Sequence, residues 1–183
     1  VLVGTYSQNV LAQSSRLDIE EIVVTGTKRD IGQQDAAIAV SAITEQAFNN
    51  TFANEVTNLG ALVPNLTLTT QPGFNAVSGG IRGTGSVSIL VTEDPSVAFL
   101  VDDFGLNHVQ SQFVEMFDIE QIEVYRGPQG TLFGKNATGG VISVTTKKPV
   151  LDEYSGEFSA LAGQYDWNEG SINKFKLALN VPI

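Results

Sequence analysis

Hydrophobic and polar positions alternate or run together in short segments that predict a set of β-strands. Three segments between turn-forming residues are typical of strands: Leu66 to Thr70, Val97 to Val101 and Val141 to Thr145. The apolar run Val97 to Val101 does not alternate, so we expect a central strand with both faces covered. Residues Ile119 to Tyr125 do alternate, and only the side carrying Glu120, Ile122 and Val124 is mostly apolar. We therefore expect this fourth strand to bury one side.

Short helical segments and loops are predicted between the strands. Thr44 to Phe48 resembles a capped helical turn, and Asn54 is a candidate cap for a second helix. One stripe of that second helix carries Val56, Leu59 and Val63. Gln71 to Thr84 is rich in glycine, asparagine and serine and is expected to be mainly loop, whereas Gln129 to Phe133 fits one helical turn. Residues 28–149 thus predict a domain of the α+β class around one core.

The residues after Pro149 have the pattern of a β-hairpin. One face of its second strand is apolar and carries Phe175, Leu177, Leu179 and Val181. Ser155 to Gln164 is the expected partner strand, across a turn at Tyr165 to Asn173. An isolated hairpin is marginal in water, and a bare aliphatic face favours aggregation. We therefore expect residues 150–183 to belong to a larger sheet, and the chain to be part of a longer protein.

Two segments precede the predicted domain. Residues 1–15 end in small residues around Ala12, a pattern typical of either the tail of an export signal or a flexible end. Residues Leu17 to Thr27 contain a β-branched run that is entered through acids and closed by Gly26, which predicts a short strand. No neighbouring segment of the sequence is a candidate partner for this run, so we expect its edges to be unpaired.

Charge and composition exclude several classes of function. The 183 residues carry 10 Lys and Arg against 20 Asp and Glu, a net charge of −10 that has the wrong sign for binding phosphate backbones. The chain has no cysteine and one histidine, which excludes disulfides, thiolate metal sites and paired-histidine metal motifs within it. No apolar run approaches the length of about 18 residues that a membrane-spanning helix needs. We expect no nucleic-acid partner, no metal and no cofactor.

The motifs that suggest catalysis fail on their spacing or on their partners. Gly127 to Asn136 resembles a phosphate-binding loop, but its glycine spacing is one residue too short, and Asn136 replaces the Ser or Thr that binds Mg²⁺. Gly80 to Gly85 has the wrong order for a dinucleotide-binding loop. His108 has no Ser or Cys partner in a recognisable motif. Solvated loops account for the acid pairs Glu93-Asp94 and Asp102-Asp103. We predict that the chain is not an enzyme.

Four stretches, taken in order along the chain, carry a family resemblance. They are Glu21 to Thr25 followed by a basic pair, Leu62 to Leu66, Ile81 to Gly83, and the long run from Ile119 to Pro149. Together they resemble the plug domain of TonB-dependent outer-membrane receptors. The resemblance implies that residues 28–149 are an α+β plug with a small mixed four-stranded sheet and short helices. It also implies that residues 150–183 are the first hairpin of a transmembrane β-barrel of about 22 strands.

The implied function is TonB-dependent active transport of a scarce solute across the bacterial outer membrane, with the plug gating the barrel lumen. Residues 16–27 resemble the TonB box segment, which the periplasmic TonB complex captures by adding a strand. The residues expected to bind it are Glu20, Glu21, Ile22, Val23, Val24, Thr25 and Gly26. The solute is a siderophore, cobalamin, a saccharide or another scarce compound. The alternative is a non-transporting plug-like module, periplasmic or on the surface, in which the same segment is a docking strand.

The resemblance also assigns candidate residues to gating and to solute binding. Arg82 and Arg126 match plug arginines that meet glutamates on the inner barrel wall, and the alternative is pairing with local acids such as Glu123. The solute-binding candidates offer amide and aromatic groups on extracellular loops: Gln71, Phe74, Asn75, Asn107, His108 and Gln110. Asp102 to Gly105 and Lys135 to Thr138 depart from the family pattern, which weakens an assignment to ferric siderophores.

Overall fold

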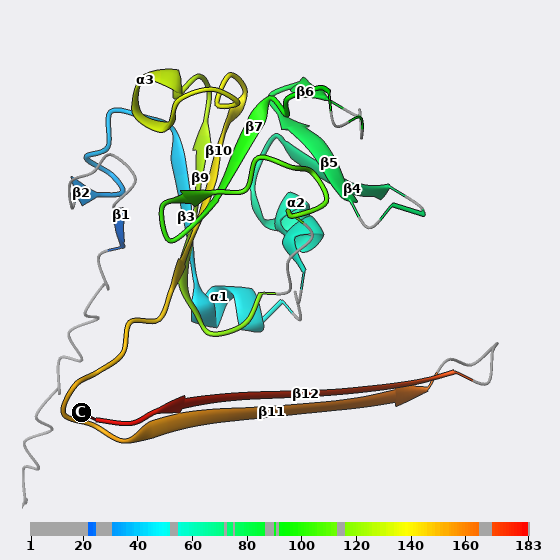
Figure 1. Ribbon diagram of the computed structural model, residues 1–183. Coiled ribbons are helices and arrows are strands. Elements are labelled where there is room, and N and C mark those ends of the chain that lie inside the picture. Colours follow the sequence, from blue (N-terminus) through cyan, green and yellow to red (C-terminus); the bar gives the residue numbers. More distant parts are fainter. Residues whose placement is uncertain are drawn as a thin grey trace, which may run out of the picture.

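A mixed β-sheet forms the centre of the protein (Figure 1). The computed structural model describes residues 22–24, 31–51, 55–71, 73–74, 76–86, 90, 92–112, 116–164 and 170–182. In spatial order, the strands of the central sheet are β3 (Val40–Thr44), β9 (Ile119–Arg126), β10 (Gly140–Thr146), β7 (Val97–Val101) and β8 (Phe104–Gly105). Strands β10 and β7 run parallel, and the other neighbours are antiparallel. This confirms the expected mixed sheet of four strands, to which the two-residue strand β8 adds an edge.

A second sheet of three antiparallel strands occupies most of the region expected to be loop, Gln71 to Thr84. It contains β4 (Leu66–Gln71), β5 (Ala76–Ile81) and β6 (Thr84–Ser86). A Cβ atom at Gly79 would lie 1.9 Å from the Thr67 carbonyl oxygen of the neighbouring strand. The loop prediction was therefore wrong. Gly79 does not mark a turn, because the missing side chain lets the backbones of two neighbouring strands approach closely inside a sheet.

The helical segments are short. They are α1 (Glu45–Asn49), the 3₁₀ turn η1 (Val56–Asn58), α2 (Leu59–Leu62) and α3 (Gly130–Phe133). Thr44 caps α1, as predicted, because its hydroxyl accepts a hydrogen bond from the Ala47 N–H at 3.4 Å. Asn54, the expected cap of the second helix, lies outside the described residues. The apolar stripe predicted for that helix is confirmed by the burial of Val56, Leu59 and Val63.

Apolar clusters cover both faces of the central sheet. The larger cluster includes Ile43, Phe48, Val56, Leu59, Phe99, Ile122, Val124, Ile142 and Val144. The cluster on the opposite face, here called the second cluster, comprises Val24, Val40, Ala98, Leu100, Tyr125, Ala137 and Val141. The prediction that β9 buries only one side was wrong, because Glu123 and Tyr125 on its other side are 1% and 0% exposed. The second cluster supplies this cover. Strand β7 has both faces covered, as predicted.

The amino-terminal β-branched run forms a paired strand, which corrects the expectation of free edges. Strand β1 (Val23–Val24) pairs antiparallel with β2 (Ile31–Gly32). Its Val24 side chain is fully buried in the second cluster. The partner was missed because a strand of two residues leaves no recognisable alternation in a sequence.

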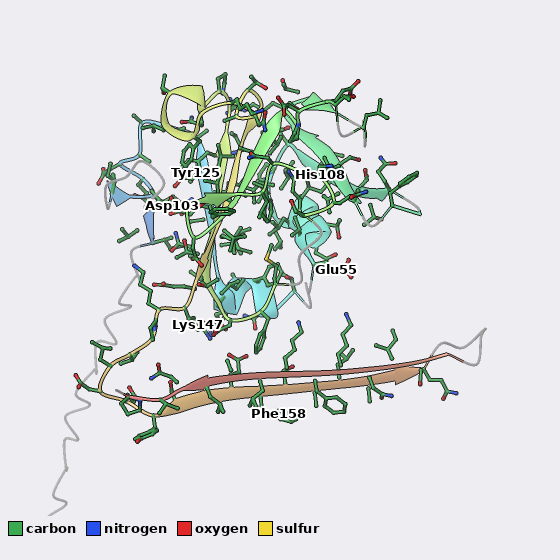
Figure 2. The ribbon with its side chains drawn as sticks, in the orientation of Figure 1. Glu55, Asp103, His108, Tyr125, Lys147 and Phe158 are labelled. Carbon is green, nitrogen blue, oxygen red and sulfur yellow. The ribbon has the colours of Figure 1, made fainter. Side chains whose placement is uncertain are left out.

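The carboxy-terminal residues form a hairpin, as their pattern predicts. Strands β11 (Ser155–Gln164) and β12 (Ser171–Asn180) pair antiparallel along their whole length. One face is apolar and exposed, and Phe158 on that face points away from the domain (Figure 2). The other face carries Glu157 and Lys176, which contact the domain. Among the described residues, no helix is long and apolar enough to cross a membrane.

Candidate functional site

Residues 22–24, the described part of the segment expected to dock onto a partner, lie against the central sheet. In β1, the side chain of Val23 is 42% exposed, whereas that of Val24 is buried. The carbonyl oxygen of Ile22 accepts a hydrogen bond from the Gln33 N–H, and that of Val23 accepts one from Gln121 Nε2 on β9, each at 2.9 Å. The other predicted members of this segment lie outside the described residues: Glu20, Glu21, Thr25 and Gly26.

A buried polar network lies beneath β1. Gln121 Nε2 also donates to Glu123 Oε1 at 3.0 Å, and the Tyr125 hydroxyl donates to Glu123 Oε2 at 2.7 Å. A buried carboxylate is costly unless donors satisfy it, so these two hydrogen bonds compensate part of the burial of Glu123. The ring of Tyr125, labelled in Figure 2, lies 5.8 Å from that of Phe133 on α3. The sequence prediction missed this network. Its signal is the set of polar residues at alternate positions of β9.

The two candidate gating arginines lie near each other at the ends of strands. Arg82 occupies the turn after β5 with a φ of 53°, and its N–H donates to the Asn65 carbonyl oxygen at 2.9 Å. Arg126 ends β9, and a Cβ added at the next residue, Gly127, would lie 3.6 Å from Arg82 Nη1. The Nε of Arg126 is buried and has no hydrogen-bond partner among the described residues. Glu123, the local acid considered as its alternative partner, is engaged in the network beneath β1.

The turn between β4 and β5 carries the first group of solute-binding candidates. Gln71 Nε2 donates to the hydroxyl of the buried Ser78 at 2.7 Å, so this amide is used within the second sheet. Phe74 is 53% exposed at the tip of the turn. Asn75 lies outside the described residues. Of the two described candidates in this turn, Phe74 is the one whose side chain is exposed.

The loop after β8 carries the second group, Asn107, His108 and Gln110. Asn107 and Gln110 are exposed, and His108, labelled in Figure 2, is half-buried. The Nδ1 of His108 accepts a hydrogen bond from the Gln110 N–H at 3.4 Å. The Val109 carbonyl oxygen accepts one from the Val77 N–H at 3.2 Å. This bond holds the loop beside the start of β5, so the two groups of candidates lie on neighbouring loops.

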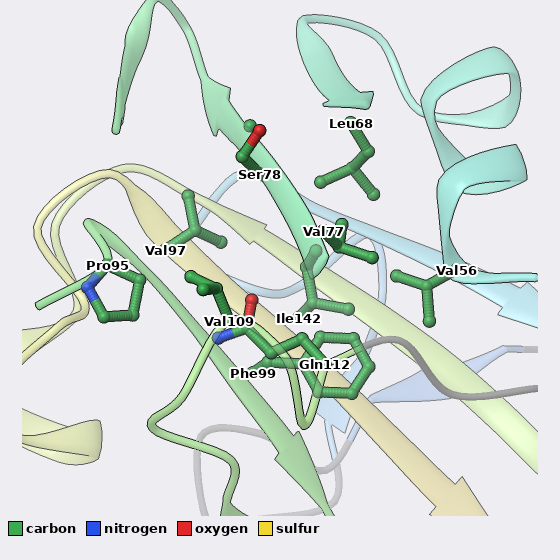
Figure 3. A pocket seen from close by; sticks show the side chains of 11 residues that line it. Val56, Leu68, Val77, Ser78, Pro95, Val97, Phe99, Val109, Gln112 and Ile142 are labelled. Carbon is green, nitrogen blue, oxygen red and sulfur yellow. The ribbon is translucent and has the colours of Figure 1, made fainter. Parts of the chain in front are cut away.

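A cavity of about 20 Å³ lies beneath the loop after β8 (Figure 3). Its lining is mostly apolar and includes Val77, Val109 and Phe99, together with the polar residues Ser78 and Gln112. A space of this size holds about one water molecule. None of the solute-binding candidates lines this cavity.

Charged side chains join the domain to the hairpin. Lys147 Nζ lies 2.6 Å from Glu45 Oε1 of α1 and 3.1 Å from Glu157 Oε2 of β11. The hydrogen bond to Glu45 is the main cause that raises the pKa of Lys147 above its ordinary value. Lys176 Nζ of β12 lies 5.5 Å from the centre of the Phe117 ring. A groove of about 770 Å³ runs between the domain and the hairpin beside Lys147. The polar face of the hairpin is therefore its contact face with the domain.

Two of the acids expected in solvated loops have structural partners. Asp94 accepts hydrogen bonds from Lys135 Nζ at 3.1 and 3.2 Å, which ties the glycine-rich loop to the segment before β7. Asp102 accepts from the Thr146 N–H at 2.9 Å and from the Thr146 hydroxyl at 2.7 Å. In the part of the chain that the structure describes, no group of three or more His, Cys, Asp or Glu is placed to hold a metal ion.

Comparisons with known proteins agree on one family. A family model described as the TonB-dependent receptor plug domain matches residues 32–141. The iron-regulated outer membrane virulence protein of Vibrio cholerae is 31% identical over 147 residues, which cover 78% of this chain and 22% of that protein. The pesticin receptor of Yersinia pestis is 29% identical, over 75% of this chain and 20% of its own length.

The fold is also similar to that of solved receptors. The crystal structure of the siderophore receptor PiuA from Acinetobacter baumannii matches with a TM-score of 0.61 at 22% sequence identity. The match covers 89% of this chain and 20% of PiuA. The chain thus spans about a fifth of the length of the proteins it resembles.

Proposed function

Since the chain belongs to the family of TonB-dependent outer-membrane receptors, we propose that residues 28–149 are the plug of an active transporter in the bacterial outer membrane. The plug blocks the lumen until energy is delivered from the periplasm, and a scarce solute then passes. The observation that carries this proposal is the plug-family match over residues 32–141.

The amino-terminal segment is the part on which the partner acts. We assign residues 20–26 to strand capture by the TonB complex, because strand addition uses main-chain hydrogen bonds and suits a β-branched run. The weak attachment of β1 to the rest of the plug supports this assignment. The strand is two residues long and pairs with β2 at two positions, so it offers a strand that a partner can take over at low cost.

The solute docks on the exposed loops opposite this segment. Phe74 offers an aromatic surface, and Asn107, His108 and Gln110 offer polar groups on the neighbouring loop. Gln71 contributes less, because its amide is already bonded to Ser78. The exposed carbonyl, amide and ring groups suit a polar solute with hydrogen-bonding groups and a flat face. They do not select a siderophore over cobalamin or a saccharide.

Residues 150–183 supply the first hairpin of the barrel. Its exposed apolar face carries Phe158, Phe175, Leu177 and Leu179. A face of this kind is suited to lipid, and the opposite face, with Glu157 and Lys176, is suited to the plug-filled lumen. Lys147 and its two glutamates then form a contact between plug and wall.

Arg126, together with Arg82, locks the plug to glutamates of the barrel wall. The buried Arg126 Nε without a partner among the described residues supports this assignment. We expect Arg126→Ala to weaken plug attachment by about 3 kcal/mol, because removing one member of a buried ion pair strands the other charge. The thermal midpoint of unfolding of the full-length receptor should fall. Cells that make the variant should become permeable to a bulky antibiotic that the outer membrane normally excludes.

The control for Arg126 is Lys135→Ala. Lys135 forms an ion pair with Asp94 in which the two side chains are 71% and 60% exposed, so its loss should cost less than about 1 kcal/mol. Equal effects of the two substitutions would contradict the lock.

The proposed function is tested by uptake of labelled candidate solutes into cells that make the full-length receptor as their only route. We expect one solute to accumulate, and accumulation to stop when a protonophore collapses the proton-motive force or when residues 20–26 are deleted. Surface binding of the solute should persist in both cases. The alternative, a plug-like binding module, predicts binding that neither treatment changes and no accumulation at all.

A further inference from the structure

We propose that Gln121 is a latch that retains strand β1 on the plug until the energy-transducing partner captures it, and that Glu123 and Tyr125 position this latch. The inference deepens the proposed function and rests on it, because it assumes that the β1 segment is what the partner pulls. It is based on one pair of hydrogen bonds that start from the same nitrogen atom. A single atom, Gln121 Nε2, bonds both to the Val23 carbonyl oxygen in β1 and to the Glu123 carboxylate of the sheet.

The orientation of the Gln121 amide is dictated by its neighbours. Both groups that it contacts are hydrogen-bond acceptors, at 2.9 and 3.0 Å, so only the NH₂ end satisfies them, and each of its two N–H bonds is used. A reversed amide would place its oxygen against two other oxygens. The Tyr125 hydroxyl holds the far oxygen of Glu123 at 2.7 Å. The buried side chains of Glu123 and Tyr125 on β9 therefore fix the orientation of the Gln121 amide.

Within the part of the chain that the structure describes, the remaining attachments of β1 are few. The strand pairs with β2 at two positions, whereas β9 pairs with β10 at seven. Its other attachments among the described residues are the Val24 side chain, which is fully buried in the second cluster, and the hydrogen bond that the Ile22 carbonyl oxygen accepts from the Gln33 N–H just before the strand. The hydrogen bond from Gln121 is thus a large share of the described contacts that hold β1 on the plug. Its loss should shift the equilibrium between docked and undocked β1 more than the loss of one bond would for a longer strand.

Release of β1 leaves the network beneath it intact. When Val23 departs, Gln121 keeps its bond to Glu123, and its second N–H turns to water, because Gln121 is half-buried at the rim. Glu123 and Tyr125 keep their mutual bond. Undocking of Val23 therefore leaves in place both hydrogen bonds that Glu123 accepts from side chains of β9. The latch opens and closes without unfolding the sheet.

The test uses the buried side chain of Val24 as a reporter. The chain has no cysteine, and any cysteine elsewhere in the full-length receptor is replaced by serine. Val24→Cys then supplies a single thiol. Because position 24 is buried, we expect this thiol to react with a maleimide only when β1 undocks. In this background we expect Gln121→Leu to raise the labelling rate about five- to tenfold, the effect of losing a hydrogen bond that secures the docked state. Tyr125→Phe should give a smaller rise, since Glu123 then holds the amide less firmly.

Gln112→Leu is the matched control. Gln112 is also a glutamine whose Nε2 donates to a backbone carbonyl, that of Leu106 at 3.0 Å, but it lies in the loop after β8, away from β1. It should leave the labelling rate unchanged. If Gln121→Leu does not fold, Gln121→Met removes the donor with an unbranched side chain of similar length and no charge, and should have the same effect. Circular dichroism and the thermal midpoint of each variant show whether the rise reflects undocking or general unfolding.

The outcomes separate the latch from the proposed function. Faster labelling of the Gln121 variants, together with tighter binding of the purified periplasmic domain of TonB, supports both. Labelling equal to that of the Val24→Cys parent overturns the latch and leaves the proposed function standing. Faster labelling with no binding of the TonB domain to any variant, solute present or absent, overturns the role of the segment in energy coupling, and with it the functional meaning of the latch.

Discussion

Val23→Pro is expected to abolish energised uptake while solute binding continues. Val23 lies in the middle of the segment assigned to strand capture and forms one of the two residue pairs of β1 with β2. Proline removes the backbone N–H and fixes φ, so the residue can no longer donate to an added strand. Uptake should fall to the rate seen in cells treated with a protonophore. The measurement compares initial uptake rates and equilibrium binding of the labelled solute in the same cells.

Val23→Thr is the control for this substitution. Threonine keeps the N–H and the β-branched shape, and the 42% exposure of Val23 leaves room for its hydroxyl in water. Uptake by this variant should remain close to normal. Normal energised uptake by Val23→Pro would show that main-chain pairing at this position is not the coupling step, whatever the threonine variant does.

The parts of the fold that were predictable are those encoded by neighbours in sequence. Alternation located β9, the continuous apolar run located β7, and Thr44 marked the start of α1. These elements were predictable because the period of burial and the capping group lie within the element itself. The hairpin β11–β12 was predictable for the same reason, since its two strands follow one another in the sequence.

The parts that were not predictable depend on distant residues. Gln121 bonds to Val23, which lies 98 positions away. The residues around β9 in the sequence therefore do not indicate that its polar side is covered. The two glycines of β5 resemble turn residues until the neighbouring strands β4 and β6 are in place. The candidate arginines were identified from motif order, and their partners remain a proposal because the described residues do not supply them.

Gly140→Ala is expected to destabilise the plug strongly. Gly140 begins β10, the strand between β9 and β7, and has a φ of 153°. A Cβ atom there would lie 2.3 Å from the Tyr125 carbonyl oxygen and 2.6 Å from Ile81 Cδ1. Both the backbone conformation and the contact oppose a side chain, so we expect a loss of about 3 kcal/mol or more in the free energy of unfolding of the plug.

Gly130→Ala separates this effect from the general consequence of adding a methyl group. Gly130 begins α3, and a Cβ atom there would have no neighbour within 4 Å, so alanine should be neutral or slightly stabilising through its higher helix propensity. Hydrogen exchange of the β9 and β10 amides in the full-length receptor measures both variants. A loss of 3 kcal/mol corresponds to exchange that is roughly a hundredfold faster in Gly140→Ala. Because β9 carries Gln121, the same variant should also speed labelling of Val24→Cys, and unchanged exchange would mean that β10 shifts to accept the methyl group.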